Sequence, residues 1–88
     1  MARKEQSADG IDAKWGASCF SPDEAHLNSV MVQRSRRRVA VVDHSKFGVP
    51  TGWRICDVAD IHVLVTDTGA TLAATEPFER AGVKVMRV

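Results

Sequence analysis

Two short segments of this sequence carry side chains that could bind a polar ligand. Asp9 and Asp12 stand three positions apart, and a pair of carboxylates can accept hydrogen bonds from sugar hydroxyls. The same segment also suits an Asx-type turn, which needs no ligand. In the second segment, Asp43 and Lys46 come directly after the apolar run 39–42. These residue types indicate the binding of an anionic, hydroxylated molecule.

The position of Lys46 favours a ligand more strongly than its residue type does. The apolar run before Asp43 is typical of a strand that is buried on both faces of a sheet. In open α/β sheets, ligands bind beyond the carboxyl ends of the strands. A lysine at that place offers a mobile cation to a phosphate or a carboxylate, and Ser45 with the turn amides adds hydrogen-bond donors. The alternative is a solvated surface lysine, which is the usual state of this residue.

The other titratable residues predict neither a metal site nor a nucleic-acid interface. The three histidines match no zinc-ligand spacing, and we expect no metal and no cofactor. Cys19 and Cys56 are far apart, which favours two reduced thiols over a disulfide. Four arginines lie within 34–38, but cations also suit the last turn of a helix. Because 12 Lys and Arg against 11 Asp and Glu leave a net charge of +1, we expect no direct DNA binding by this chain.

A helix is predicted over residues 22–36. Ser21 suits the N-cap, and Glu24, three residues later, completes an S-x-x-E capping box. Apolar residues then recur at the helical period and predict the buried face. They are Leu27, Val30 and Met31.

Three apolar runs predict the strands of one parallel sheet. They cover 39–42, 61–66 and 83–88, and the last of them alternates apolar and polar residues, as an edge strand does. Between the first two runs, 53–56 is predicted as an extended segment and 57–60 as one helical turn. Strands that alternate with helices indicate parallel pairing.

The remaining segments have less regular patterns. Pro77 removes a helical donor, so the last helix is expected to start near Thr75 or Glu76 and to end before Gly82. Residues 1–8 are predicted to be a disordered tail, because they are polar and lack periodicity. Residues 13–20 are predicted to be a loop.

These elements predict an α/β fold, a partial three-layer sandwich with a mostly parallel sheet. The 88 residues make at most one small domain. A parallel sheet needs helices on both faces, yet only two helices are predicted. We therefore expect residues 9–88 to form an incomplete domain, whose exposed sheet edge favours self-association or pairing with a missing portion. No run approaches the ~20 apolar residues of a membrane span and no signal peptide is evident, so we expect a cytoplasmic protein without a membrane partner.

Several motifs, in order and spacing, resemble one protein family. The segment from Ala8 to Val88 resembles the C-terminal half of the effector-sensing domain of DeoR-type bacterial transcriptional repressors. The most specific piece is Asp43-His44-Ser45-Lys46-Phe47-Gly48 after a strand, which is similar to that family's D-x-S-K-F-G. Asp9-Gly10-Ile11-Asp12, Pro22-Asp23-Glu24-Ala25 and the runs 60–67 and 81–85 also agree. The chain departs from the family at Gly16-Ala17-Ser18-Cys19, where the family has Gly-Leu-Thr or Gly-Phe-Thr.

The resemblance implies a fold and a ligand. The family's sensing domain is similar to sugar-phosphate isomerases of the ribose-5-phosphate type, and it binds a phosphorylated sugar that changes operator affinity. By this resemblance, Asp9 and Asp12 match an active-site motif of the isomerases, and Glu24 lies near the ligand. The alternative for Glu24 is a helix cap without a ligand. The family's N-terminal helix-turn-helix has no counterpart in this sequence.

Three functions are compatible with these observations. The first is an effector-sensing module of a DeoR-type regulator, without a helix-turn-helix and without enzymatic activity. The second is a fragment of an isomerase-like enzyme, which the lack of upstream strands and of a phosphate loop disfavours. The third is a non-functional remnant of a truncated repressor gene. For the first function, the predicted ligand-binding residues are Asp9, Asp12, Glu24, Asp43 and Lys46.

Overall fold

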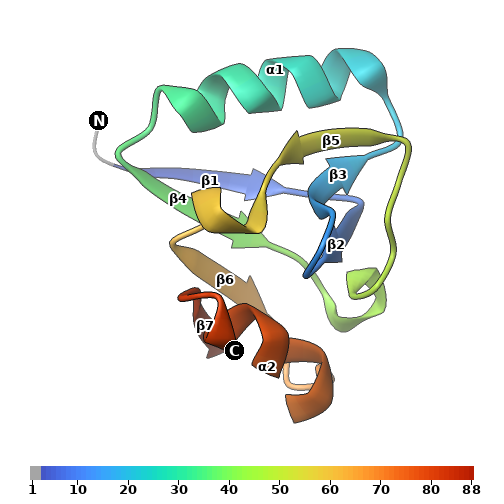
Figure 1. The fold of residues 1–88 in the computed structure, drawn as a ribbon, viewed down its shortest axis with the longest axis vertical. Coiled ribbons are helices and arrows are strands. Elements are labelled where there is room, and N and C mark those ends of the chain that lie inside the picture. The colour runs from blue at the N-terminus through green and yellow to red at the C-terminus, as the bar shows by residue number, and fades with distance from the viewer. Residues whose placement is uncertain (1–2) are drawn as a thin grey trace.

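The computed structural model describes residues 3–88 and has the α/β class that the sequence predicts (Figure 1). The elements follow in the order β1 (Arg3–Ser7), β2 (Gly10–Asp12), β3 (Gly16–Cys19), α1 (Pro22–Gln33), β4 (Arg37–Val41), the 3-10 turn η1 (His44–Lys46), β5 (Trp53–Cys56), the 3-10 turn η2 (Val58–Asp60), β6 (Val63–Thr66), α2 (Leu72–Arg80) and β7 (Lys84–Arg87). Within the described part of the chain, neither helix could cross a lipid bilayer.

The strands form two sheets and not the one sheet of the predicted sandwich. The larger sheet has the order β1-β4-β6-β7 and is parallel throughout, and the smaller sheet, β2-β3-β5, is antiparallel. The predicted parallel pairing of the three apolar runs is confirmed, since Val41 lies opposite Val65 and Val65 lies opposite Met86. The smaller sheet was not predicted. Residues 53–56, which were expected to be extended, form β5, but β2 and β3 lie in segments that were expected to be a turn and a loop.

The N-terminal segment differs from its prediction. Arg3–Ser7 form β1, so the expected disordered tail over residues 1–8 was wrong for this segment, while residues 1 and 2 lie outside the described residues. β1 pairs with β4 along its whole length. Backbone pairing satisfies N–H and C=O groups whatever the side chains are, so a polar segment without periodicity can join a sheet edge. The predicted loop over 13–20 likewise contains β3.

The first helix begins as predicted but packs through other residues. The Ser21 hydroxyl accepts a hydrogen bond from the Glu24 amide at 3.4 Å. The second hydrogen bond of the predicted capping box, from the Ser21 amide to the Glu24 carboxylate, is not among the described hydrogen bonds. The helix ends at Gln33, earlier than expected. Its buried residues are Ala25 and Val32, whereas Leu27 is 60% exposed. The predicted buried face was therefore wrong at Leu27, because α1 rests on β5 and β3 through its smaller side chains.

The second helix tolerates an internal proline. It begins at Leu72, so the expected start near Thr75 or Glu76 was wrong. The Thr71 hydroxyl caps it by accepting a hydrogen bond from the Ala74 amide at 3.1 Å. Pro77 removes only the bond to the carbonyl four residues earlier, which lies in the exposed first turn, where water can replace the lost donor.

All connections between the strands of the large sheet lie on one of its faces. The four strands follow one another across the sheet in chain order, so each connection moves on to the next strand in the same direction. Because connections between parallel strands are right-handed, all three connections then pass over the same face of the sheet. The hydrophobic core agrees, because it joins Ala40 and Leu64 of the sheet to Val32 of α1, Ile55 of β5 and Phe78 of α2. In Figure 1 the small sheet, η2 and α2 lie in front of the paler strands of the large sheet. The described chain therefore has two layers and not the predicted three.

Candidate functional site

Polar residues gather where neighbouring strands of the large sheet end. β4 is followed by Asp43 and η1, and β6 is followed by Asp67. Because β4 and β6 are paired in parallel, these residues stand at the same edge of the sheet. Asp9 follows β1, the neighbour of β4 on its other side, and so stands at this edge as well. The carboxyl edge of a parallel sheet is the usual ligand position in this architecture.

An ion pair joins the ends of β4 and β6. The His44 amide donates a hydrogen bond to Asp67 Oδ1 at 3.1 Å, and His44 Nδ1 lies 2.8 Å from Asp67 Oδ2. The hydrogen bond and the charge of Asp67 raise the pKa of His44, and the same hydrogen bond lowers the pKa of Asp67. Gly69 leaves room for this imidazole, because a Cβ at residue 69 would lie 2.7 Å from His44 Nδ1. The ring is thus held from two sides, while 56% of the side chain stays exposed.

Asp43 shapes the turn that carries Lys46. Its Oδ1 accepts a hydrogen bond from the Ser45 amide at 2.8 Å and another from the Ser45 hydroxyl. The hydrogen bond from the hydroxyl, then that from the amide, lower the pKa of Asp43, and the charge of Lys46 acts in the same direction. Asp43 is therefore an ionised N-cap, and its second oxygen has no hydrogen-bond partner among the described residues.

Lys46 ends this turn with a partly buried side chain. Its amide donates to the Asp43 carbonyl at 3.1 Å, which closes the turn. The ammonium group forms no ion pair with any acidic residue in the described part of the chain. Because the donors to Asp43 come from Ser45, the charge of Lys46 remains available to an external anion.

A surface hollow of about 250 Å³ lies beside η1. The backbone joins β2 to this region, since the Gly48 amide donates to the Ile11 carbonyl at 2.8 Å and Ile11 pairs with Phe47. The lining consists of Asp12, Ala13, Phe47, Gly48, Ala74, Pro77 and Phe78. The volume approaches the ~300 Å³ at which small-molecule pockets begin. The hollow therefore adds one carboxylate and an apolar wall next to the turn of Lys46.

Asp12 forms an Asx-type turn, the predicted alternative to a ligand contact. Its Oδ2 accepts hydrogen bonds from the amides of Lys14 and Trp15 at 2.9 and 2.8 Å. The carboxylate nevertheless lines the hollow, so the two interpretations are compatible. Its other oxygen has no described hydrogen bond and can accept one from a ligand hydroxyl.

Glu24 lies outside this group of residues. It stands in the first turn of α1, near Cys19, whose pKa is raised mainly by burial and further by the charges of Asp9 and Glu24. The Asp9 carboxylate accepts a hydrogen bond from the Phe20 amide at 3.0 Å. Among the described residues, no hydrogen bond or ion pair links Glu24 with η1. The structure thus places Asp12, Asp43 and Lys46 at or beside the η1 turn, whereas Asp9 and Glu24 lie near Cys19.

Asp67 is not among the site residues predicted from the sequence. A signal was available, because Asp67 follows the apolar run 61–66 in the same way as Asp43 follows 39–42. Parallel pairing places both residues at one edge. The contact with His44 depends in addition on the strand register and on Gly69, which the apolar pattern does not specify.

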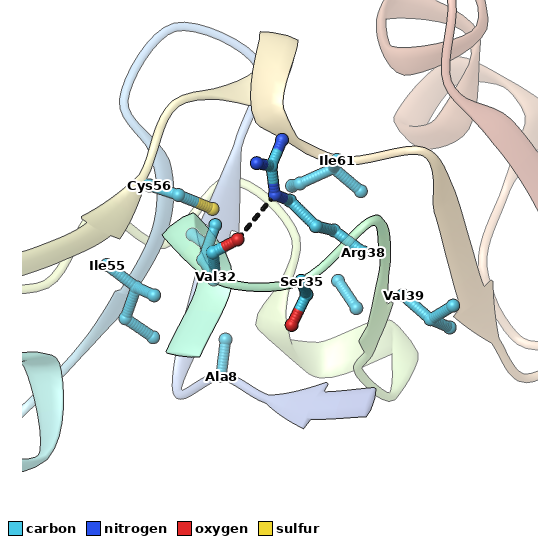
Figure 2. A pocket seen from close by; sticks show the side chains of 10 residues that line it. Ala8, Val32, Ser35, Arg38, Val39, Ile55, Cys56 and Ile61 are labelled. Carbon is cyan, nitrogen blue, oxygen red and sulfur yellow. Dashed lines mark hydrogen bonds between the residues drawn. The ribbon is translucent and has the colours of Figure 1, made fainter. Parts of the chain in front are cut away.

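A second cavity lies between α1, β4 and β5 and has a different character (Figure 2). Its volume is about 20 Å³, which is room for about one water molecule. Arg38 Nε donates a hydrogen bond to the Val32 carbonyl at 2.6 Å at its margin. Burial raises the pKa of Cys56 to about 11, so this thiol is protonated at neutral pH. The cavity is too small for a sugar and does not compete with the carboxyl edge as a ligand site.

The sequence is similar to a sensor family and to several regulators. The family profile described as the DeoR C terminal sensor domain matches residues 6–68. The HTH-type transcriptional regulator GolR of Listeria innocua is 32% identical over 79 residues, which are 90% of this chain and 31% of that protein. The Deoxyribose operon repressor of Escherichia coli K12 is 34% identical over 61 residues, 69% of this chain and 24% of the repressor. The HTH-type transcriptional regulator GlpR of Haloferax volcanii is 29% identical over 76 residues, 86% of this chain and 30% of that protein. The chain spans about a third or less of the length of these relatives.

Proposed function

This chain belongs to the DeoR C-terminal sensor domain family, and from that premise we propose that it senses a phosphorylated sugar at the carboxyl edge of its parallel sheet. The family supplies the sensing role, and its relatives are named as transcriptional regulators and a repressor. The class of ligand rests on the side chains at the edge. We propose no catalytic role, because the carboxylates there hold turns and lack the ordered acid and base partners that proton transfer needs.

The observation that carries the proposal is the arrangement of Lys46 next to the pair of His44 and Asp67. Lys46 has an unpaired ammonium in the described structure. The raised pKa of His44 increases the fraction of imidazolium near neutral pH, and its Nε2 makes no described hydrogen bond. A cationic lysine with an adjacent imidazolium suits a phosphate dianion, because charge-assisted hydrogen bonds are the stronger ones.

The carboxylates supply the second half of the recognition. Asp12 and Asp43 each use one oxygen for their own turn and keep the other for a hydroxyl. Asp9 and Glu24 lie farther along, near Cys19, and we propose that they contact the end of the sugar away from the phosphate. The apolar wall of the hollow, with Phe47 and Phe78, then packs against the sugar carbons.

A ligand titration tests this proposal. Chemical shifts of the chain are followed by NMR against pairs of sugars with and without a phosphate. We expect millimolar binding of a phosphorylated sugar and none of its unphosphorylated form. Lys46→Ala removes one charge-assisted hydrogen bond, about 1.5–3 kcal/mol, and so weakens binding roughly 10- to 150-fold. Lys84→Ala, at an exposed lysine at the amino end of β7 and so at the opposite end of the sheet, is the control and leaves the affinity unchanged.

Two results would contradict the proposal at different levels. If Lys46→Ala binds as well as the unchanged chain, the assignment of Lys46 is wrong. If no phosphorylated sugar binds at all, the class of effector is wrong.

We further propose that this chain does not bind operator DNA by itself. The net charge is +1, and Arg38 is held by the Val32 carbonyl, with Asp60 4.0 Å away. A basic excess usually accompanies DNA binding. Gel-shift titration at physiological salt should give no sequence-specific complex, and a nanomolar complex would contradict this view.

A further inference from the structure

An arginine on β7 reaches across to the segment that follows β6. Arg87 Nε donates a hydrogen bond to the Ala70 carbonyl at 3.3 Å, and Arg87 Nη2 donates another to the Thr75 hydroxyl. Arg87 lies on the same face of β7 as Val85, which packs against the core. We use the name β6–α2 loop for residues 67–71. The planar guanidinium therefore ties the end of this loop to the start of α2.

The stability of α2 alone does not explain Arg87. The side chain is half-buried and forms no ion pair with an acidic residue in the described part of the chain. It lies beside the amino end of α2, where the helix dipole disfavours a cation. Thr75 is fully buried, and its hydroxyl is 3.3 and 3.4 Å from the carbonyls of Thr71 and Leu72, to which it donates. The hydroxyl is thus oriented to accept from Arg87.

The β6–α2 loop also holds His44. The Ala70 amide donates to the Asp67 carbonyl at 3.3 Å, which closes the loop into a turn. Within this turn, the Asp67 carboxylate contacts the amide and the imidazole of His44, and Gly69 lies against the ring. Ala70 is therefore bonded to Arg87 through its carbonyl and to Asp67 through its amide. A continuous series of contacts leads from Arg87 to His44.

We propose that Arg87 is a positioning residue of the effector site, because it fixes the β6–α2 loop and the loop fixes His44 beside the turn of Lys46. This inference rests on the proposed function, in which Lys46 and His44 bind the phosphate. The carboxyl ends of β4, β6 and β7 lie at one edge of the sheet. Among the described residues, no hydrogen bond or ion pair joins Arg87 to η1, so its effect passes through the loop.

The imidazole of His44 reports this role without a ligand, and an NMR titration of the free chain measures its pKa. Arg87→Lys keeps the charge but loses the two fixed donors, and Arg87→Gln removes the charge as well. If the loop shifts, Asp67 moves away from the ring. Both substitutions should then lower the pKa of His44, as Asp67→Asn does but by less. Loss of a nearby positive charge alone would raise that pKa, so the sign of the change separates positioning from charge.

Control variants on α2 make this test specific. Arg80→Gln removes an exposed arginine that pairs with Glu76, and it should leave the pKa of His44 unchanged. Thr75→Val removes the hydroxyl that accepts from Arg87 without changing a charge, and it should lower the pKa of His44. Thr75→Ser keeps the hydroxyl and should not. Circular dichroism melts verify that the variants fold, and the Thr75 pair decides the question if an Arg87 variant does not.

Binding gives a second readout, with inorganic phosphate as the probe. Arg87→Lys should raise the Kd for phosphate about two- to tenfold, which corresponds to the loss of one hydrogen bond. The proposal is overturned if the pKa of His44 is unchanged or higher in both Arg87 variants and in Thr75→Val. It is also overturned if that pKa falls while the affinity for phosphate stays the same. Failure of the unchanged chain to bind any phosphorylated sugar would instead contradict the proposed function, and the pKa of His44 would still show whether Arg87 holds the loop.

Discussion

Truncation of Leu64 tests the position of the core. Leu64 is fully buried in β6, between β4 and β7, and belongs to the cluster that joins the large sheet to the second layer. Leu64→Ala removes apolar contacts on the face of the large sheet that packs against the second layer, and it leaves a cavity that the flanking strands cannot close. Such substitutions cost about 3–5 kcal/mol. A domain of 88 residues has a free energy of unfolding of roughly 4–13 kcal/mol, so the variant should lose about a quarter or more of its stability.

Urea denaturation at one protein concentration measures this loss, with the fluorescence of Trp15 and Trp53 and with circular dichroism as probes. The concentration is the same for both variants, because any self-association would add to the apparent stability. Leu72→Ala is the control, since Leu72 is 72% exposed at the start of α2, and it should change the free energy of unfolding by less than about 0.5 kcal/mol. If the two substitutions lower the free energy of unfolding equally, Leu64 does not lie at the centre of a core between the large sheet and the second layer.

Four further results are expected. Asp67→Asn should lower the pKa of His44, measured by NMR of the imidazole, because Asp67 raises it; an unchanged pKa would contradict the pairing. In the unchanged chain, the stabilisation from His44 is fully present below the unfolded pKa of His44, near 6.5, and is lost as the pH rises through its raised folded pKa. The stabilisation from Asp67 is present above the unfolded pKa of Asp67, 3.8, and is lost as the pH falls through its lowered folded pKa. The difference in urea midpoint between the unchanged chain and Asp67→Asn should therefore be largest between pH 3.8 and pH 6.5. Cys56, with a pKa of about 11, should react slowly with a thiol reagent at pH ~8 in the folded chain and rapidly in urea; fast reaction in both states would show that the thiol is accessible. Gly10→Ala should destabilise by about 1–3 kcal/mol or more, because its Cβ would lie 1.9 Å from a backbone carbonyl oxygen, whereas Gly52→Ala meets no atom within 4 Å and should be nearly neutral in the same denaturation assay.

The sequence predicts the parts of the fold that depend on local patterns. The apolar runs identify β4 and β6 because a strand buried in a parallel sheet needs apolar side chains on both faces, and the alternation over 83–88 identifies β7 as an edge strand. Ser21 marks the start of α1 because its hydroxyl satisfies a free amide of the first turn. The position of Lys46 after β4 follows from the same pattern, since the run ends just before Asp43.

The parts that were missed depend on pairing between distant segments. β1 has no apolar pattern and is held by backbone bonds to β4, so its side chains give no signal. The exposed position of Leu27 depends on how α1 meets β5 and β3, which helical periodicity does not determine. Asp67 reaches His44 only through the register of β6 against β4. In each case the deciding contact is long-range and appears only once the strand order is known.

The strand order has a consequence for the synthesis of the protein. Because the large sheet is ordered β1-β4-β6-β7, each strand pairs with a strand that the ribosome has already made. No strand of this sheet therefore has to wait for its partner to be synthesised, and the four strands can fold as a unit once β7 has been made. β7, the last of these four strands along the chain, pairs with β6 at the edge of the sheet and does not have to insert between strands that are already paired.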